Sequence, residues 1–123
     1  MVASSHIAAL FRLVRLPNLV IISVTQVLIR YCVIGPLLSQ AHMELQLTGF
    51  QFTLLVVATV LTAAAGYVIN DYFDRKIDRL NKPGEVIVGR KIFPRHAMAY
   101  HLVFSITGAL AGTWLSFRTG EPY

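Results

Sequence analysis

The sequence NDYFDRKIDRLNKP, residues 70–83, decides the fold, and it follows directly on an apolar run at 52–69. The stretch holds three of the six carboxylate residues of the protein, spaced at i, i+3 and i+7. With about 100° of rotation per residue of an α-helix, five of its oxygen-bearing side chains fall within a sector of roughly 100°. They are Asn70, Asp71, Asp74, Asp78 and Asn81. The pattern predicts an acidic face at the end of a long apolar helix.

Carboxylates stacked on one face repel one another unless a cation lies among them. Oxygen ligands of this type suit Mg²⁺, which keeps part of its water and also binds substrate phosphates. We therefore expect Asp71, Asp74 and Asp78 to be metal ligands, with Mg²⁺ as the cofactor. The alternative is a solvated, charged helix end closed by Asn-Lys-Pro. An ordinary charged terminus would mix its signs around the helix instead of collecting its acids on one side.

The composition indicates an integral membrane protein. Of 123 residues, 55% are hydrophobic and only 14% are charged, and the mean hydropathy is +0.61; this is too apolar for a soluble domain of this length. The net charge of +5 would suit nucleic acid, but seven of the eleven Lys and Arg residues lie between Arg75 and Arg95. That distribution is typical of a cytoplasmic membrane loop, so we expect a lipid bilayer and no nucleic acid as partner.

Four helices are expected, in an all-α membrane protein with a single domain over residues 1–123. A short amphipathic helix at 5–16 would lie in the membrane interface. Three transmembrane helices would follow, each of about the length that a bilayer core requires. They cover about 18–38, 52–74 and 97–117.

The positions of the basic residues orient the chain in the cell (inner) membrane as a multi-pass protein. The N-terminus and the basic loop at 75–96 are expected to be cytoplasmic, and the loop at 39–51 external. The acidic face would then lie at the cytoplasmic surface, within reach of soluble diphosphates and magnesium.

Several polar side chains outside the acidic stretch are candidates for anion binding. Asn18, Gln26 and Arg30 recur along one edge of the first spanning helix. An arginine within a span is costly against lipid, so Arg30 would line an anion-binding cavity, or else snorkel or pair with a neighbouring helix. Lys82 and Arg90, beside turn residues near the acids, would reach an anion, or else only hold the loop in the cytoplasm.

The order of the motifs resembles the N-terminal third of the UbiA-type intramembrane prenyltransferases. The matching motifs are RLPN at 15–18, NDYFDRKID at 70–78 and NKP at 81–83. The resemblance covers about residues 10–117, and the NDxxDxxxD pattern followed by NKP is a specific signal.

The resemblance implies transfer of a polyprenyl group from a prenyl diphosphate donor to an aromatic or hydroxyl acceptor, such as a glycerol-phosphate-type molecule. It implies that Asp71, Asp74 and Asp78 are the catalytic metal ligands. Asn18 and Asn70 would support the metal or the diphosphate. Magnesium and cationic side chains would stabilise the charge on the leaving group.

The chain departs from the family pattern in one respect. The family usually has about nine spanning helices and a second aspartate-rich motif, whereas no aspartate follows Asp78 here. We therefore expect a partial domain of a nine-helix bundle that carries only the first motif and is inactive alone. Its missing partners would be the C-terminal helices or another copy.

Within the family, the sequence looks similar to bacterial geranylgeranylglycerol-phosphate geranylgeranyltransferase-like members, with quinone precursors and haem still open as acceptors. The alternative function is a non-catalytic three-helix membrane module for binding or assembly. A CDP-alcohol phosphotransferase would carry Asp-Gly and Ala-Arg pairs before its acids, which this sequence lacks. A soluble prenyl synthase would not contain three apolar spans.

Overall fold

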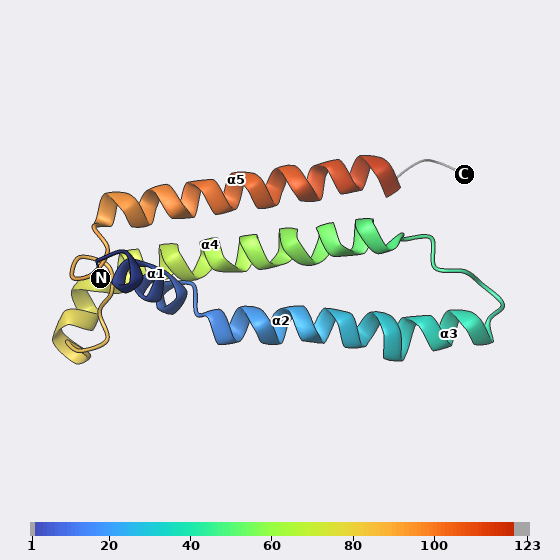
Figure 1. Cartoon of the computed structure of the whole chain (residues 1–123), viewed down its shortest axis with the longest axis horizontal. Coiled ribbons are helices and arrows are strands. Elements are labelled where there is room, and N and C mark those ends of the chain that lie inside the picture. Colours follow the sequence, from blue (N-terminus) through green and yellow to red (C-terminus); the bar gives the residue numbers. More distant parts are fainter. Residues whose placement is uncertain (1, 120–123) are drawn as a thin grey trace.

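The acidic stretch forms the end of the longest helix in a computed structural model that describes residues 2–119. This helix lies between two other long rods (Figure 1). The elements in chain order are α1 (Val2–Leu13), α2 (Leu16–Leu28), the π-helix η1 (Ile29–Ile34), α3 (Gly35–Gln40), α4 (Gly49–Asn81) and α5 (Pro94–Thr119). The described part is 81% helical without a strand.

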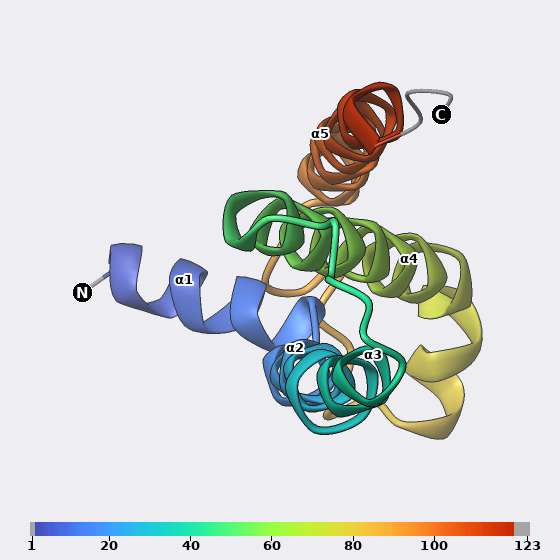
Figure 2. The same cartoon turned by 90° about the vertical axis from the view of Figure 1, so that its right-hand side faces the viewer.

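Three helical rods are long and apolar enough to cross a membrane, which confirms the prediction of an all-α membrane protein with three spans. They are Leu16–Gln40, in which α2, η1 and α3 run on continuously, Gly49–Asn81 and Pro94–Thr119. Viewed end-on, α4 lies between α5 on one side and the α2–α3 rod on the other (Figure 2).

The second span is longer than the predicted 52–74 at both ends. It begins at Gly49 because Thr48 and Gln51 form a reciprocal capping box: the Gln51 N–H donates to Thr48 Oγ1 at 3.2 Å, and the Thr48 N–H donates to Gln51 Oε1 at 2.9 Å. Such a cap satisfies backbone donors that the first turn leaves unpaired. The helix continues through the acids to Asn81, just before Lys82-Pro83, so the basic segment at 75–81 is helical.

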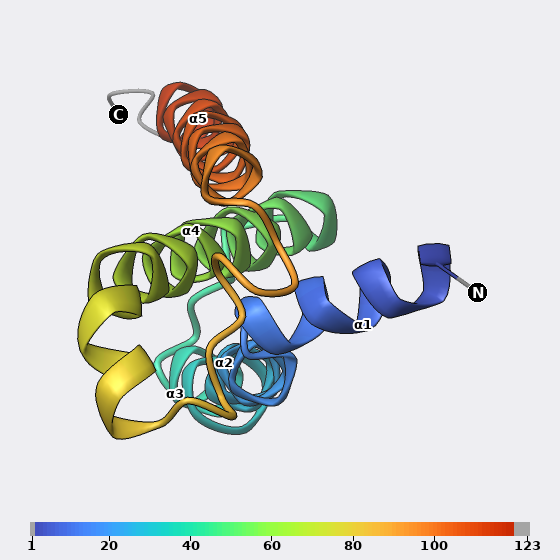
Figure 3. The ribbon, with the colours of Figure 1, turned by 90° about the vertical axis from the view of Figure 1, so that its left-hand side faces the viewer.

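The N-terminal helix also differs in its bounds from the predicted 5–16. It ends at Leu13, and Arg15 has a left-handed backbone with φ 54° and ψ 58°. Pro17 then occupies the first turn of α2, where its missing N–H and fixed φ are tolerated. The chain therefore turns sharply at Arg15, and α1 leaves the bundle sideways (Figure 3).

The main buried cluster lies at the end of the bundle that carries this corner. Leu13 of α1 and Val68 of α4 are fully buried against Val88 and Ile92 of the connection between α4 and α5. Gly89, with φ 88°, makes the turn between those two, and its N–H donates to Ile92 O at 2.7 Å. The connection is thus packed against α1 and α4 through its apolar residues.

Close packing holds α5 against α4. Gly108 of α5 is buried, and a Cβ built there would lie 2.9 Å from Thr62 Oγ1 and 3.2 Å from the Ala58 carbonyl oxygen. His101 Nδ1 lies 3.0 Å from the Ala65 carbonyl oxygen. Small residues permit this approach between membrane helices.

Candidate functional site

An open groove lies where the α1–α2 corner meets the end of α4 and the α4–α5 connection. Its volume is about 800 Å³, and polar and apolar side chains both line it. The lining residues are Phe11, Arg12, Arg15, Leu16, Pro17, Asn18, Asp71, Lys82, Glu85 and Ile87. Three residues predicted from the sequence, Asn18, Asp71 and Lys82, are therefore brought together from distant parts of the chain.

The contact between Arg15 and Asp71 joins the two walls of this groove. Arg15 Nη2 donates to Asp71 Oδ1 at 3.2 Å, and the Arg15 guanidinium lies 5.0 Å from the centre of the Tyr67 ring. Asn18 Nδ2 donates to Tyr67 Oη at 3.5 Å. Tyr67 precedes Asp71 by four residues, so both lie on one face of α4. The groove thus has a built-in cation beside its carboxylate.

Arg15 and Tyr67 are site residues that were not predicted as such. For Arg15 the available signal was its place in the RLPN motif, before the turn at Leu16-Pro17. A left-handed conformation costs a non-glycine residue about 1–3 kcal/mol and persists only where its surroundings enforce it. For Tyr67 the signal was the i, i+4 spacing to Asp71.

The other two predicted carboxylates lie further along α4 and do not line the groove. Asp74 Oδ2 accepts a hydrogen bond from Asn70 Nδ2 at 3.0 Å, so this pair forms one polar unit on the same helix. Asp78 is half-buried in the next turn. Within residues 2–119, no three His, Cys, Asp or Glu side chains lie close enough together to hold a metal ion.

The donor set nevertheless suits a magnesium site that a substrate completes. Magnesium in proteins is usually held by one or two carboxylates, with water and substrate phosphates filling the remaining positions. Asp71 supplies hard carboxylate oxygens to the open groove, and Asp74, bonded to the amide of Asn70, lies one helical turn further along α4. The assignment of Asp71, Asp74 and Asp78 as metal ligands stays a prediction.

The two predicted basic residues of the loop are placed differently. Lys82 lines the groove, and its Nζ lies 3.8 Å from Glu85 Oε2, with both side chains exposed. Arg90 Nη1 donates to the Pro83 carbonyl oxygen, and the side chain does not line the groove. Of these two basic residues, only Lys82 lines the same groove as Asp71.

Arg30 is not brought to the acidic site. It lies in η1, twelve residues after Asn18, which corresponds to roughly 18 Å along a helix. Its Nη2 donates to the Leu47 carbonyl oxygen at 2.8 Å, near the start of α4. The predicted role of Arg30 in binding the same substrate anion has no geometric support in this arrangement.

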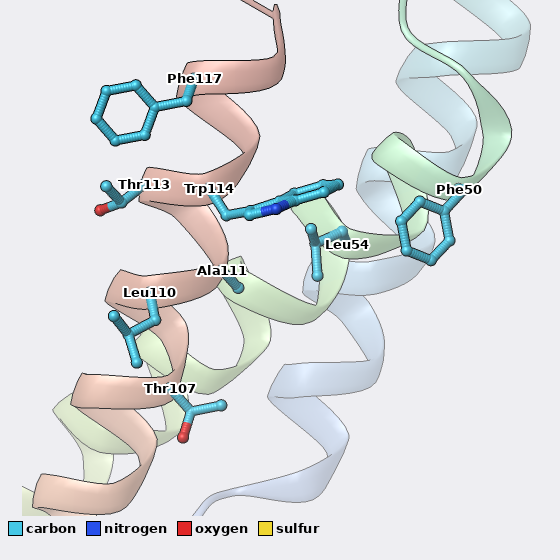
Figure 4. A pocket seen from close by; sticks show the side chains of 8 residues that line it. All are labelled: Phe50, Leu54, Thr107, Leu110, Ala111, Thr113, Trp114 and Phe117. Carbon is cyan, nitrogen blue, oxygen red and sulfur yellow. The ribbon is translucent and has the colours of Figure 1, made fainter.

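An apolar groove of about 610 Å³ lies between α4 and α5 (Figure 4). Its lining comes from the start of α4 and the second half of α5, whereas the acids lie near the end of α4. Trp114 and Phe117 of α5 and Phe50 of α4 contribute its aromatic side chains. It contains no ionisable side chain, so it offers apolar contact and no acid–base or metal chemistry.

Comparison with known proteins identifies the kind of chain to which this site belongs. The model of the UbiA prenyltransferase family matches residues 28–120. A digeranylgeranylglyceryl phosphate synthase of Hyperthermus butylicus is 39% identical over 98 residues, which are 79% of this chain and 30% of that protein. The synthase of the same name from Halobacterium salinarum is 48% identical over 59 residues, or 47% of this chain and 21% of that protein.

A third synthase of this name, from Natronomonas pharaonis, is 53% identical over 45 residues. The chain covers between 16% and 30% of the length of these three relatives. All three are archaeal, whereas the sequence pattern was interpreted as similar to bacterial members. No solved structure matches the chain.

Proposed function

The chain is a member of the UbiA prenyltransferase family, and from that premise we propose that it seats a prenyl diphosphate for magnesium-dependent transfer of the prenyl group in the membrane. The observation that carries the proposal is the groove that unites Asn18, Asp71 and Lys82 with Arg15 at the end of α4. The charged side chains of the groove suit the anionic diphosphate of the donor, and its apolar side chains suit the start of the prenyl tail.

The diphosphate would lie among the cationic side chains of the groove. Arg12, Arg15 and Lys82 contribute three positive charges to its lining, against the carboxylates of Asp71 and Glu85. Charge-assisted hydrogen bonds from arginine are well suited to phosphate oxygens. Asn18 adds an amide donor at the start of α2. The isoprenoid tail would extend along apolar helix surface within the bilayer.

Asp71, Asp74 and Asp78 would hold the magnesium ions, with Asn70 positioning Asp74 through their hydrogen bond. Bound magnesium would neutralise charge on the diphosphate as it leaves. The cationic side chains that line the groove would stabilise the same negative charge on the leaving diphosphate. The bond between the allylic carbon and the diphosphate oxygen breaks, and the electron pair departs with the oxygen. The acceptor hydroxyl then bonds to that carbon and releases its proton to solvent.

The names of the relatives support a lipid acceptor for this chain. Digeranylgeranylglyceryl phosphate contains prenyl groups on a glyceryl phosphate, so we propose a glycerol-phosphate-type hydroxyl as acceptor and a geranylgeranyl diphosphate as donor. The groove would face the cytoplasm of a multi-pass protein in the cell membrane, with the N-terminus and the α4–α5 connection on that side. Soluble diphosphate would enter from there.

Calorimetric titration of the purified chain with geranylgeranyl diphosphate tests the donor site. We expect binding with Mg²⁺ that is lost in EDTA and weakened about tenfold or more by Asp71→Asn or Asp74→Asn, because each removes a charged ligand. Glu44→Gln, which removes a carboxylate from the loop before α4, is the matched control and should bind as the wild type does. Donor binding that depends neither on magnesium nor on these aspartates would contradict the proposal.

A second measurement tests transfer itself. The same samples receive radiolabelled donor and geranylgeranylglyceryl phosphate, and the lipid product is separated. Product that depends on Mg²⁺ and on Asp71 supports transfer by this chain and would overturn the expectation that it is inactive alone. Magnesium-dependent donor binding without product would agree with that expectation and restrict this chain to donor binding.

A further inference from the structure

A second groove lies between α1 and the α4–α5 connection, next to the donor groove that Arg15 and Asp71 line. Its volume is about 470 Å³, room for about fifteen water molecules and therefore for a phosphate group with the glycerol that carries it. Arg12 lines both grooves, so the two are neighbours that share one guanidinium. The lining residues of the second groove are Ser5, His6, Ala8, Ala9, Arg12 and Lys91.

The packing of α1 on the connection brings two cations from distant parts of the chain to this groove. Ala9 and Leu13 of α1 belong to the same buried cluster as Ile92 of the connection (Figure 3). Arg12 directly precedes Leu13 in the chain, and Lys91 directly precedes Ile92. Burial of the apolar neighbours therefore keeps the two basic positions close together, while both basic side chains stay exposed.

The second groove has the charge of an anion site. Among the described residues that line it there is no carboxylate, and neither Arg12 nor Lys91 forms an ion pair with another residue in the part of the chain that the structure describes. Arginine binds phosphate oxygens through paired N–H groups and lysine binds them as a point charge. The donor groove differs, because Asp71 and Glu85 lie among its cations.

The proposed reaction requires a second phosphate close to the diphosphate. In a glyceryl phosphate acceptor, the hydroxyl that reacts and the phosphate are carried by the same glycerol. The phosphate therefore lies only a few bonds from the place where the diphosphate departs. Two anions this close repel each other, and a cation shared between them reduces the repulsion. Arg12 lines both grooves, so its guanidinium is available to both anions.

We propose that the second groove binds the phosphate of the glyceryl phosphate acceptor, through Lys91 and through Arg12, which also serves the donor diphosphate. This inference rests on the proposed function and deepens it, since it assigns the choice of acceptor to α1 and the connection. The predicted place of α1 in the membrane interface suits the headgroup of a lipid acceptor. An aromatic acceptor without a phosphate would gain nothing from Lys91.

The test is calorimetric titration of the full chain, purified in detergent, with geranylgeranylglyceryl phosphate and with the corresponding phosphate-free alcohol. Wild type should bind the phosphate lipid about tenfold or more tightly than the alcohol. Lys91→Gln should weaken binding of the phosphate lipid about tenfold and leave binding of the alcohol and of geranylgeranyl diphosphate unchanged. Lys91→Arg, which keeps the charge, should restore it. Arg12→Gln should weaken binding of both the acceptor and the donor.

Arg95→Gln is the matched control, because Arg95 is an exposed cation in the first turn of α5 that lines neither groove. It should bind the acceptor as the wild type does. Equal binding of the phosphate lipid by wild type and Lys91→Gln would overturn the site. Phosphatidylglycerol or inorganic phosphate that binds as tightly as the acceptor, and loses that binding in Lys91→Gln, would overturn the acceptor assignment.

The donor titration judges the proposed function separately. Wild-type protein that fails to bind geranylgeranyl diphosphate, yet binds the phosphate lipid through Lys91, would contradict the donor proposal and support the second groove. Protein that binds the donor with magnesium, but binds the phosphate lipid and the alcohol equally, would support the donor proposal and overturn the second groove.

Discussion

Arg15 Nη2 lies 3.2 Å from Asp71 Oδ1, which links the corner between α1 and α2 to the acidic end of α4. The side chains are 46% and 23% exposed, so the pair is partly hydrated and contributes at most about 1 kcal/mol to stability. Its significance is electrostatic: Arg15 places a fixed positive charge against a carboxylate that is predicted to bind magnesium. Arg15 and a metal ion would therefore compete for Asp71.

Arg15→Gln is predicted to separate metal binding from diphosphate binding. Removing the competing cation should raise the affinity for Mg²⁺ a few-fold, while loss of a phosphate donor should weaken diphosphate binding about tenfold. Titration calorimetry with each ligand measures the two effects. Arg118→Gln, on α5, is the control for loss of net charge. A fall in both affinities with lost helix content would instead assign Arg15 a purely structural role.

The packing of α4 against α5 gives a prediction with an internal control. Gly108→Ala places a Cβ 2.9 Å from Thr62 Oγ1 and 3.2 Å from the Ala58 carbonyl oxygen, and such overpacking costs about 1–3 kcal/mol. Thermal or denaturant unfolding in detergent, followed by circular dichroism, measures it.

Gly112→Ala is the matched variant, since nothing lies within 4 Å of a Cβ built there. It should be neutral or slightly stabilising, because alanine is favoured over glycine in a helix. Equal destabilisation by the two variants would show that α5 packs on α4 through a different face.

The α4–α5 connection depends on the left-handed turn at Gly89. With φ 88° and Arg79 Nη2 only 2.6 Å from the position of an added Cβ, Gly89→Ala should destabilise the connection by about 1–3 kcal/mol and loosen the burial of Val88 and Ile92. Limited proteolysis would then cut this segment faster. Gly84→Ala, in the same connection and with open space around it, should leave the cleavage rate unchanged.

The three spanning helices could be predicted from the sequence, but the groove could not. Apolar runs and basic-residue distribution identify three spans because backbone hydrogen bonding in lipid leaves few alternatives. The i, i+3, i+7 spacing identifies an acidic face because it depends only on helix geometry.

The contacts of Arg15 with Asp71 and Tyr67 arise from tertiary packing, and periodicity within one helix carries no information about them. The position of Arg30 shows the same limit. Its place in an apolar span predicts a side chain with a polar partner, but only its contacts with Leu47 and Phe52, near the start of α4, show that it lies away from the acids near the end of that helix.

The proposed orientation places the groove on the cytoplasmic side, and single cysteines test it. In a background with Cys32→Ser, Glu44→Cys lies in the loop before α4 and Lys91→Cys in the α4–α5 connection, and both native side chains are exposed. The excess of Lys and Arg around the connection favours its retention in the cytoplasm. A membrane-impermeant maleimide should therefore label position 44 in intact cells and position 91 only after permeabilisation. The reverse labelling pattern would place the acids outside, where a cytoplasmic diphosphate donor has no access to Asp71.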